Sequence, residues 1–366
     1  MGTDRVGSGR GVQSAEPAGG GAGEGDPRAG APVLSTVTDD LVGAVLGLEI
    51  SVALYLDGRA HVLGLPDSFF TPWHGLVYGG LLLLGGWIAV VSRRAAVRHR
   101  LGVVARIPAG YGFAAAGAVL FAIGGAGDLA WHQIFGIEAD LDALLSPSHL
   151  WLFVAGSLLM SGPILAARRR AGPASFGVKL TVTLAVTSIT AIWAFAVSFT
   201  SGFLTDPESF TVGGAAQVPE GSFTVVGLSG YLVSSFVLVV PVVYLIRARL
   251  AFFGTVTVLV TSLALLASLL EDFHDPRVVL AALAAAAVTD AALVTLDRRG
   301  SRARARELVA AALIPLLVWP GQLLVKNLGQ GVAWSVELVN GVVILSALLV
   351  FAAVLALGPG PSRQAR

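Results

Sequence analysis

Residues 73–100 read WHGLVYGGLLLLGGWIAVVSRRAAVRHR, an apolar run that ends in a cluster of arginines. A helix needs about 20 apolar residues to cross the hydrocarbon core of a membrane, and residues 73–92 meet that length. Arginines are retained on the cytoplasmic side of a membrane helix, so Arg93 and Arg94 also give the run a direction. The stretch therefore predicts a transmembrane helix that ends in the cytoplasm.

The whole chain has the composition of a polytopic membrane protein. Of its 366 residues, 55% are hydrophobic and only 13% are charged, and the mean hydropathy is +0.79. Soluble domains carry about a quarter charged residues, so a water-soluble fold is excluded. The sequence contains no cysteine, which excludes disulfides, thiolate metal sites and iron–sulfur clusters. The net charge of +1 argues against a nucleic-acid partner.

Hydropathy predicts an all-α bundle of about ten spans in five hairpins. Their approximate bounds are 40–63, 73–92, 109–132, 148–167, 176–200, 223–246, 251–271, 277–296, 307–326 and 334–357. The turns after even-numbered spans are rich in arginine, whereas the odd-numbered turns hold only Arg59, Arg277 and Lys326 near their helix ends. This bias places both termini in the cytoplasm and the hairpin tips outside. We therefore expect a multi-pass protein of the cell membrane, with the lipid bilayer as its partner.

One membrane domain is expected between two tails. Residues 1–36 are rich in Gly, Ala, Ser and Pro and hold no apolar run, which is typical of a disordered cytoplasmic tail. Residues 37–357 form the predicted transmembrane domain, and residues 358–366 form a second cytoplasmic tail. Because the first tail lacks the apolar core of a secretory signal, we expect the first span to act as an uncleaved insertion signal.

The tip of the first hairpin, residues 40–92, carries a polar motif. Asp57 and His61 close one span, and Thr71–His74, with the sequence Thr-Pro-Trp-His, opens the next. Tyr78 follows four residues later. The pattern is Asp-x3-His, a loop, and Thr-Pro-x-His.

The tip of the second hairpin, residues 109–167, repeats this motif. Asp128 and His132 close one span, and Ser146–His149, with the sequence Ser-Pro-Ser-His, opens the next. Phe153 follows four residues later. Five of the six histidines, all except the one in the loop after the second span, lie at the outer ends of spans.

The spacing of the motif brings its polar side chains together. Residues four apart lie one above the other on a helix, so Asp57 and His61 share a face. Thr71 fits the N-cap of the returning helix and Pro72 its first position, so His74 projects from a helix N-terminus. The positive end of the helix dipole favours a neutral imidazole there, which is the form that binds metals. Each hairpin thus predicts a metal site with open coordination positions.

The predicted metal ligands of both copies belong at one end of the bundle, on the outer face. They are Asp57, His61, His74, Asp128, His132 and His149. Helix caps, and Asp–His pairs that only satisfy hydrogen bonds, are the alternative interpretation for a single copy. The repetition favours a site, because caps alone do not require Asp-x3-His on the preceding helix.

The pattern Asp57-x3-His61-x12-His74 resembles the metal-binding motif of the membrane C subunit of the particulate methane and ammonia monooxygenases. In that family the corresponding aspartate and histidines bind copper, which implies that Asp57, His61 and His74 are copper ligands. The resemblance covers about 18 of the 366 residues, and the ten spans and the second copy depart from that subunit. It implies a monooxygenase-like activity on a small hydrophobic substrate. By ligand type, iron and zinc remain alternatives to copper.

Further polar residues lie near the predicted sites. Glu49 lies two turns below Asp57, where a carboxylate must be protonated, paired or turned to a cavity. Glu271 and His274 belong to an acidic turn at the fourth hairpin tip. We interpret Glu49 as a partner of the ligands or a proton relay, with pairing to another helix as the alternative. For Glu271 and His274 a solvated acidic turn is favoured over a role beside the ligands. Asp290 lies inside a span, and its partner cannot be read from the sequence.

Three functions are compatible with these patterns. The first is a membrane metalloprotein with its site on the extracytoplasmic side, acting as a copper- or iron-dependent oxidoreductase. The second is a cation- or proton-coupled transporter, in which Glu49, Asp57 and His61 bind the transported ion. The third is a non-catalytic membrane scaffold. The third and fourth spans hold no acidic residue below Asp128, which favours a fixed site over a transport path.

Overall fold

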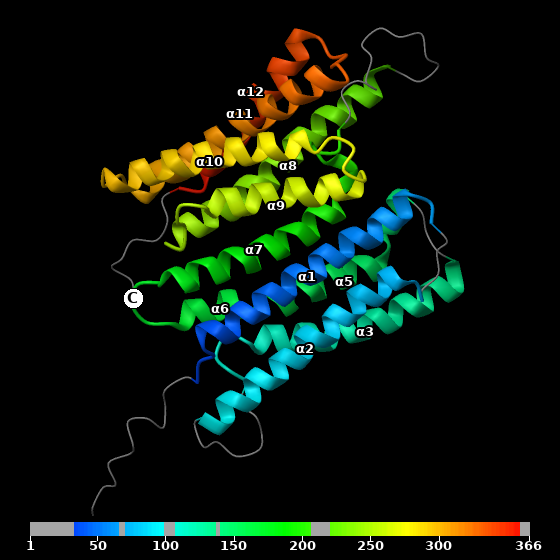
Figure 1. Ribbon diagram of the computed structural model, residues 1–366, viewed down its shortest axis with the longest axis vertical. Coiled ribbons are helices and arrows are strands. Elements are labelled where there is room, and N and C mark those ends of the chain that lie inside the picture. Colours follow the sequence, from blue (N-terminus) through cyan, green and yellow to red (C-terminus); the bar gives the residue numbers. More distant parts are fainter. Residues whose placement is uncertain (1–32, 66–69, 99–106, 137–139, 206–219, 359–366) are drawn as a thin grey trace, which may run out of the picture. The chain divides into compact units, whose positions relative to one another are not determined.

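The computed structural model of the chain describes residues 33–65, 70–98, 107–136, 140–205 and 220–358. All the regular structure in these ranges is helical (Figure 1). The helices are α1 (Val37–Val62), α2 (Pro72–Arg98), α3 (Gly112–Phe135), α4 (Asp140–Leu145), α5 (Pro147–Met160), α6 (Gly162–Arg169), α7 (Phe176–Ala196), the 3-10 turn η1 (Ser198–Thr200), α8 (Glu220–Arg247), α9 (Thr255–Leu270), α10 (Arg277–Arg298), α11 (Ala303–Gly329) and α12 (Val336–Ala356). Of the expected tails, residues 1–32 and 359–366 lie outside the described ranges.

Within the described ranges, nine helical segments are long and apolar enough to cross a membrane. They match nine of the predicted spans, and α5 and α6 together supply the fourth, Pro147–Arg169. The exception is α9, which has 16 residues. Such a helix rises about 24 Å, less than the hydrocarbon core of about 30 Å. The protein is therefore a multi-pass membrane bundle whose seventh predicted span is short.

Helices that follow one another in the chain pack as pairs in much of the bundle. Extensive contacts join α1 with α2, α3 with α5, α9 with α10, and α11 with α12. The pair α7 and α8 differs, because α7 packs mainly on α1 and α9 while α8 packs on α11 and α12. In Figure 1, α7 accordingly lies between α1 and α9. This helix joins the two motif-bearing hairpins to the rest of the bundle.

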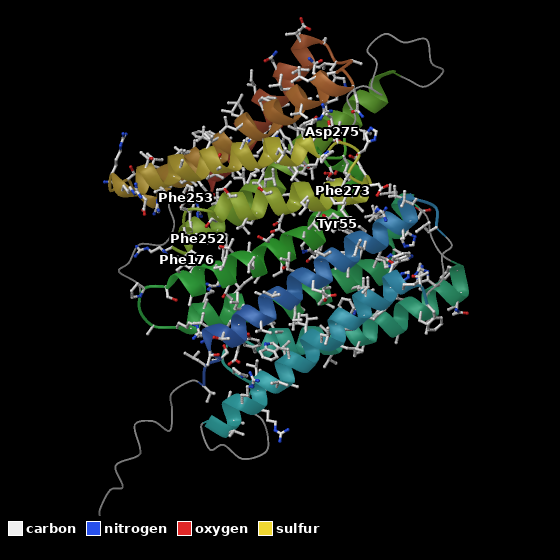
Figure 2. All side chains as sticks on the ribbon, viewed as in Figure 1. Tyr55, Phe176, Phe252, Phe253, Phe273 and Asp275 are labelled. Carbon is white, nitrogen blue, oxygen red and sulfur yellow. The ribbon has the colours of Figure 1, made fainter. Side chains whose placement is uncertain are left out.

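The two ends of the bundle differ in chemistry. We call the end at which α2, α6, α8 and α10 finish the arginine end, and the opposite end the histidine end. Phe176 and Phe252 pack with ring centroids 5.2 Å apart at the arginine end. Figure 2 shows this pair with Phe253 at one end of the bundle, and Tyr55 and Phe273 toward the other. Both copies of the Asp–His motif belong to the histidine end, where α1 and α3 finish.

Buried charges at the arginine end are paired. Asp40 Oδ1 accepts hydrogen bonds from the hydroxyls of Ser35 at 2.6 Å and Tyr111 at 2.7 Å, and its Oδ2 forms an ion pair with Arg170. Burial raises the pKa of the Tyr111 hydroxyl, and the Asp40 carboxylate raises it further, so this phenol stays a proton donor. These contacts hold the start of α1 against α3 and the end of α6. They thereby align the helices that carry the two motifs at the opposite end of the bundle.

Asp290 has a structural role. Its Oδ1 accepts the N–H of Val256 at 3.1 Å, and its Oδ2 accepts the N–H and hydroxyl of Thr257 at 2.9 and 2.8 Å. The first N–H groups of a helix have no hydrogen-bond partners inside the helix. A carboxylate at the helix start accepts hydrogen bonds from these groups, and its negative charge interacts favourably with the positive end of the helix dipole. The acid inside α10 therefore caps α9 from a neighbouring helix.

Candidate metal centre

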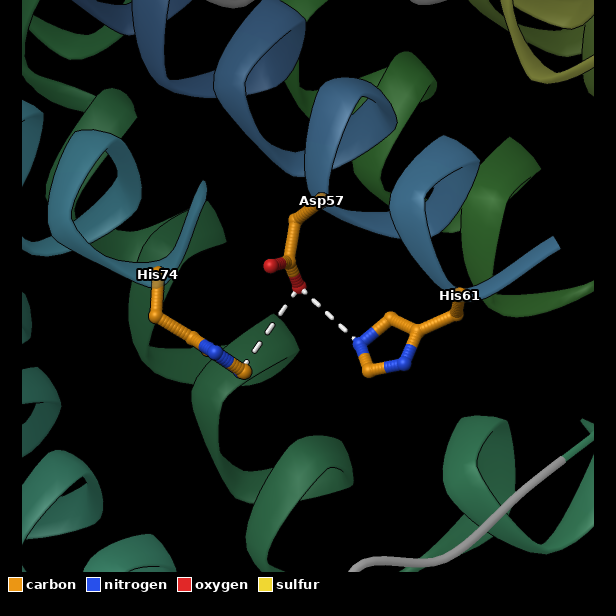
Figure 3. A group of neighbouring side chains, drawn as sticks. All are labelled: Asp57, His61 and His74. Atoms are coloured by element: carbon orange, nitrogen blue, oxygen red, sulfur yellow. Dashed lines mark ion pairs between the residues drawn. The ribbon is translucent and has the colours of Figure 1, made fainter. Parts of the chain in front are cut away.

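The first trio consists of Asp57 and His61 near the end of α1 and His74 near the start of α2 (Figure 3). Nε2 of His61 lies 3.6 Å from Asp57 Oδ2, and Nε2 of His74 lies 3.7 Å from the same oxygen. The two imidazoles meet edge to face with centroids 6.0 Å apart. One ligand atom from each residue lies within 4.8 Å of the others. The predicted convergence of these residues is confirmed.

Thr71 positions His74 in two ways. Its hydroxyl oxygen accepts the backbone N–H of His74 at 3.4 Å and lies 3.0 Å from the ring Nδ1. The first contact is the predicted N-cap, with Pro72 opening α2 as expected. The second occupies Nδ1, so the nitrogen directed at Asp57 is Nε2. Contacts of this kind hold the ring orientation of metal-binding histidines.

The second trio repeats the geometry on α3 and α5. Nε2 of His132 lies 3.5 Å from Asp128 Oδ1, and Nε2 of His149 lies 3.3 Å from it. The ligand atoms again lie within 4.8 Å of one another. Ser146 caps α5 by accepting the N–H of His149 at 3.3 Å, as the sequence predicts. All six predicted ligands therefore fall into two matching trios.

The tautomer of His132 follows from its second contact. Nδ1 lies 3.2 Å from the backbone oxygen of Gly136. A carbonyl oxygen only accepts hydrogen bonds, so Nδ1 carries the proton. In the neutral ring Nε2 then carries the lone pair, and this nitrogen faces Asp128. The arrangement prepares His132 to act as a ligand through Nε2.

Close approach of α3 and α5 brings the second trio together. Gly117 permits it, because a Cβ at this position would overlap the backbone of Leu159. Small residues at helix interfaces allow such contact between membrane helices. Asp128 and His132 are more enclosed than their counterparts in the first trio, whereas His149, at 23%, is more exposed than His74, at 11%. The side chains of Asp128 and His132 are 1% and 6% exposed, whereas that of His61 in the first trio is 36% exposed.

The contacts within the trios are compatible with a bound metal ion. The N–O distances of 3.3 to 3.7 Å exceed the usual hydrogen-bond range of about 2.7–3.2 Å. Oδ1 of Asp57 and Oδ1 of Asp128 are buried and accept no hydrogen bond from the described residues. A buried carboxylate oxygen without a partner is costly. Oδ1 of Asp128 is the oxygen that faces both histidines of its trio, so an ion with ligand distances of about 2.0–2.2 Å would supply its missing partner. In the first trio the histidines face the other oxygen of Asp57, Oδ2.

Tyr78 is a member of the site that sequence reasoning did not assign. It lies one turn after His74 on α2, and its hydroxyl donates to Asp128 Oδ2 at 3.1 Å. Its ring lies against Gly125 of α3, where a Cβ would approach the ring to 2.8 Å. The matching residue of the second hairpin is Phe153, which has no hydroxyl. That difference between otherwise similar copies is the signal that could have identified Tyr78.

The other predicted residues lie outside the two trios. Glu49 packs against Gly80 of α2, and its Oε2 is buried without a hydrogen-bond partner in the described structure. His274 is exposed, with Nε2 2.5 Å from Nε2 of Gln330. Neither His274 nor Glu271 belongs to the metal-type clusters found in the described ranges. A role for these three residues beside the ligands stays a prediction.

The fourth hairpin tip nevertheless contacts the helix of the first trio. Arg59, two residues after Asp57, binds Asp272 Oδ1 through Nε at 3.1 Å and through a terminal nitrogen at 2.5 Å. A surface ion pair thus joins the acidic turn to the end of α1.

Comparisons of the chain with protein-family models, with curated proteins and with solved structures found no match.

Proposed function

We propose that this protein is a membrane metalloprotein that holds one transition-metal ion in each Asp-His-His trio. The observation that carries the proposal is the duplication: two hairpins bring the same three residue types within 4.8 Å. Structural Asp–His contacts could account for one such group. They do not require a second with the same order of ligands, the same helix cap and the same ring nitrogen directed inward.

Copper is the favoured metal, with iron and zinc as alternatives. Two imidazoles and one carboxylate leave coordination positions open, which suits oxygen or redox chemistry with copper or iron. A bound metal would supply redox and Lewis-acid chemistry. The resemblance of the first motif to the monooxygenase C subunit supports copper and an oxidoreductase activity. We place the trios on the extracytoplasmic side, because arginines gather at the opposite end.

A groove between α2 and α3 supports a small hydrophobic substrate. It has a volume of about 530 Å³ and mainly apolar walls that include Leu82, Phe121 and Leu129. Its polar lining includes Thr71 and Tyr78. Thr71 contacts a ligand of the first trio, and Tyr78 contacts a ligand of the second. A molecule dissolved in the bilayer could reach both trios by this groove, with Tyr78 and Thr71 orienting its polar atoms.

Metal analysis of the purified protein tests the proposal. We expect about two ions per chain after copper loading and dialysis, and about one in either Asp57→Ala/His74→Ala or Asp128→Ala/His149→Ala. His274→Ala is the matched control, because this histidine lies at the same end of the bundle but outside both trios. Electron paramagnetic resonance of the copper-loaded protein should show nitrogen coupling from two imidazoles. Wild-type protein without stoichiometric metal would overturn the proposal.

Glu49 supports cation transport as a second candidate. Its buried Oε2 without a hydrogen-bond partner lies two turns from Asp57 on the same helix, which is the start of a polar path through α1. Ion uptake into proteoliposomes distinguishes the candidates. Transport predicts uptake of copper or protons that Glu49→Gln abolishes, whereas a fixed metal centre predicts no flux in either protein.

A further inference from the structure

The repeat extends from the trios to the arginine end of the bundle. Arg93–Arg94 lie 19 and 20 residues after His74, and Arg168–Arg169 lie 19 and 20 residues after His149. Each arginine pair lies near or at the end of the span that its histidine opens. The two hairpins therefore match at both ends of their second helices, although the second is divided into α5 and α6.

A groove lies beside each arginine pair. The first has a volume of about 560 Å³ and is lined by Thr36, Asp39, Val90, Arg93, Arg94 and Val97. The second has a volume of about 700 Å³, and its lining includes Gly110, Gly112, Phe113, Leu165, Arg168 and Arg169. Val90 and Leu165 each lie 16 residues after the histidine of their hairpin. The two grooves thus occupy equivalent positions in the repeat.

The grooves differ at one equivalent position. Asp39 lies 18 residues before Asp57, and Gly110 lies 18 residues before Asp128. In the first groove Asp39 Oδ1 binds Arg94 at 3.3 Å. In the second, Gly110 has a φ of +102°, and a Cβ there would overlap the backbone of Ala166. This position can therefore hold neither a carboxylate nor another side chain without distortion.

The arginines of the second groove consequently have no equivalent of Asp39 with which to pair. Arg168 and Arg169 are exposed, and neither forms an ion pair within the described part of the chain. They end the span Pro147–Arg169, at the depth where a membrane helix meets the lipid headgroups. The first turn of α3, which starts at Gly112, adds the positive end of a helix dipole.

We propose that the groove between α3 and α6 binds an anionic phospholipid. The phosphate group lies against Arg168, Arg169 and the first turn of α3, and an acyl chain follows the apolar wall of Phe113 and Leu165. Basic pockets between membrane helices recognise anionic headgroups in this way. The proposal is independent of the metal sites, because it concerns the other end of the bundle.

Native mass spectrometry of the full chain, released from nanodiscs of equal phosphatidylglycerol and phosphatidylcholine, tests the site. We expect preferential retention of phosphatidylglycerol, with a loss of about tenfold or more in Arg168→Gln/Arg169→Gln. Arg298→Gln/Arg299→Gln is the matched control, since this adjacent exposed pair ends α10 at the same end of the bundle outside the groove. The control should retain the lipid as the wild type does.

A second variant tests the apolar wall without changing the charge. A Cβ at Gly112 meets open space, so Gly112→Leu fills the groove without a clash. We expect it to reduce phosphatidylglycerol retention while leaving the unfolding temperature unchanged. Equal retention of the two lipids, equal losses in the two arginine variants, or complete displacement of the lipid by millimolar inorganic phosphate would each overturn the proposal.

Discussion

The hydroxyl of Tyr78 donates a 3.1 Å hydrogen bond to Asp128 and thereby connects the two trios. The same helix, α2, carries His74 of the first trio and holds the carboxylate of the second. Because Tyr78 occupies Oδ2, Oδ1 of Asp128 is the oxygen left to face His132 and His149. The matching residue of the second hairpin, Phe153, has no hydroxyl with which to give the first trio an equivalent contact. The two trios therefore contain the same residue types but differ in the hydrogen bonds that support their carboxylates.

Replacement of Tyr78 tests this asymmetry. We expect Tyr78→Phe to weaken metal binding at the second trio by about 10- to 100-fold, the usual effect of removing a hydrogen bond that orients a ligand. Copper titration in an Asp57→Ala background isolates the second trio, and titration in an Asp128→Ala background isolates the first. Tyr244→Phe on α8 is the control. An equal loss of metal affinity at both trios would show that Tyr78→Phe disturbs the fold as a whole and not the second trio alone.

The unequal exposure of the trios predicts an order of metal release. The His61 side chain is 36% exposed, against 6% for His132. A soluble chelator should therefore remove the ion of the first trio first, in a biphasic time course. Asp57→Ala should abolish the fast phase and Asp128→Ala the slow one. Release in a single phase from the wild-type protein would contradict this prediction.

The convergence of the trio residues could be predicted because its determinants are local. The spacing of Asp57 and His61 on one helix, and the caps supplied by Thr71 and Ser146, depend only on helical geometry and on short-range hydrogen bonds. The pairing of two adjacent spans then brings the third ligand into place. Most span positions followed in the same way from hydropathy, and α9 is the one helix at a predicted span that, within the described ranges, is too short to cross a membrane.

Features that depend on packing between distant segments could not be predicted. Asp290 had no partner in its own span, and its role as a cap for α9 appears only when the two helices are placed together. Tyr78 reaches across to α3 for the same reason. The packing of α7 on α1 also departs from the simple series of five hairpins, because helix contacts depend on side-chain fit beyond mean hydropathy.

Glu307 offers a test of the bundle's stability away from the trios. Its buried carboxylate accepts hydrogen bonds from Arg247 at 2.8 and 3.1 Å and from Arg304 at 3.0 Å, joining α8 to α11. Glu307→Gln leaves two cations without their counter-ion, and we expect a loss of about 3 kcal/mol in the free energy of unfolding. Asp297→Asn removes a carboxylate that is 61% exposed from its pair with Arg306 and should cost less, about 1 kcal/mol. Equilibrium unfolding in mixed micelles measures both, and equal losses would contradict the prediction.

Asp275, at the tip before α10, predicts a pH-dependent contribution to stability. Burial acts to raise the pKa of its carboxyl, but hydrogen bonds from the Arg277 side chain at 2.8 and 3.1 Å prevail and hold the pKa below its ordinary value of 3.8. A carboxyl whose pKa is lower in the folded state stabilises the fold fully above its unfolded pKa and loses this contribution as the pH falls through the folded pKa. Asp275→Asn should therefore lower the unfolding temperature at about pH 7, and the difference from wild type should shrink as the pH falls below 3.8.

Asp142→Asn, an exposed acid in α4, controls for general charge effects. Thermal unfolding across this pH range tests the prediction. If the difference in unfolding temperature stays constant or grows at low pH, the Asp275 carboxylate does not stabilise the tip through its charge.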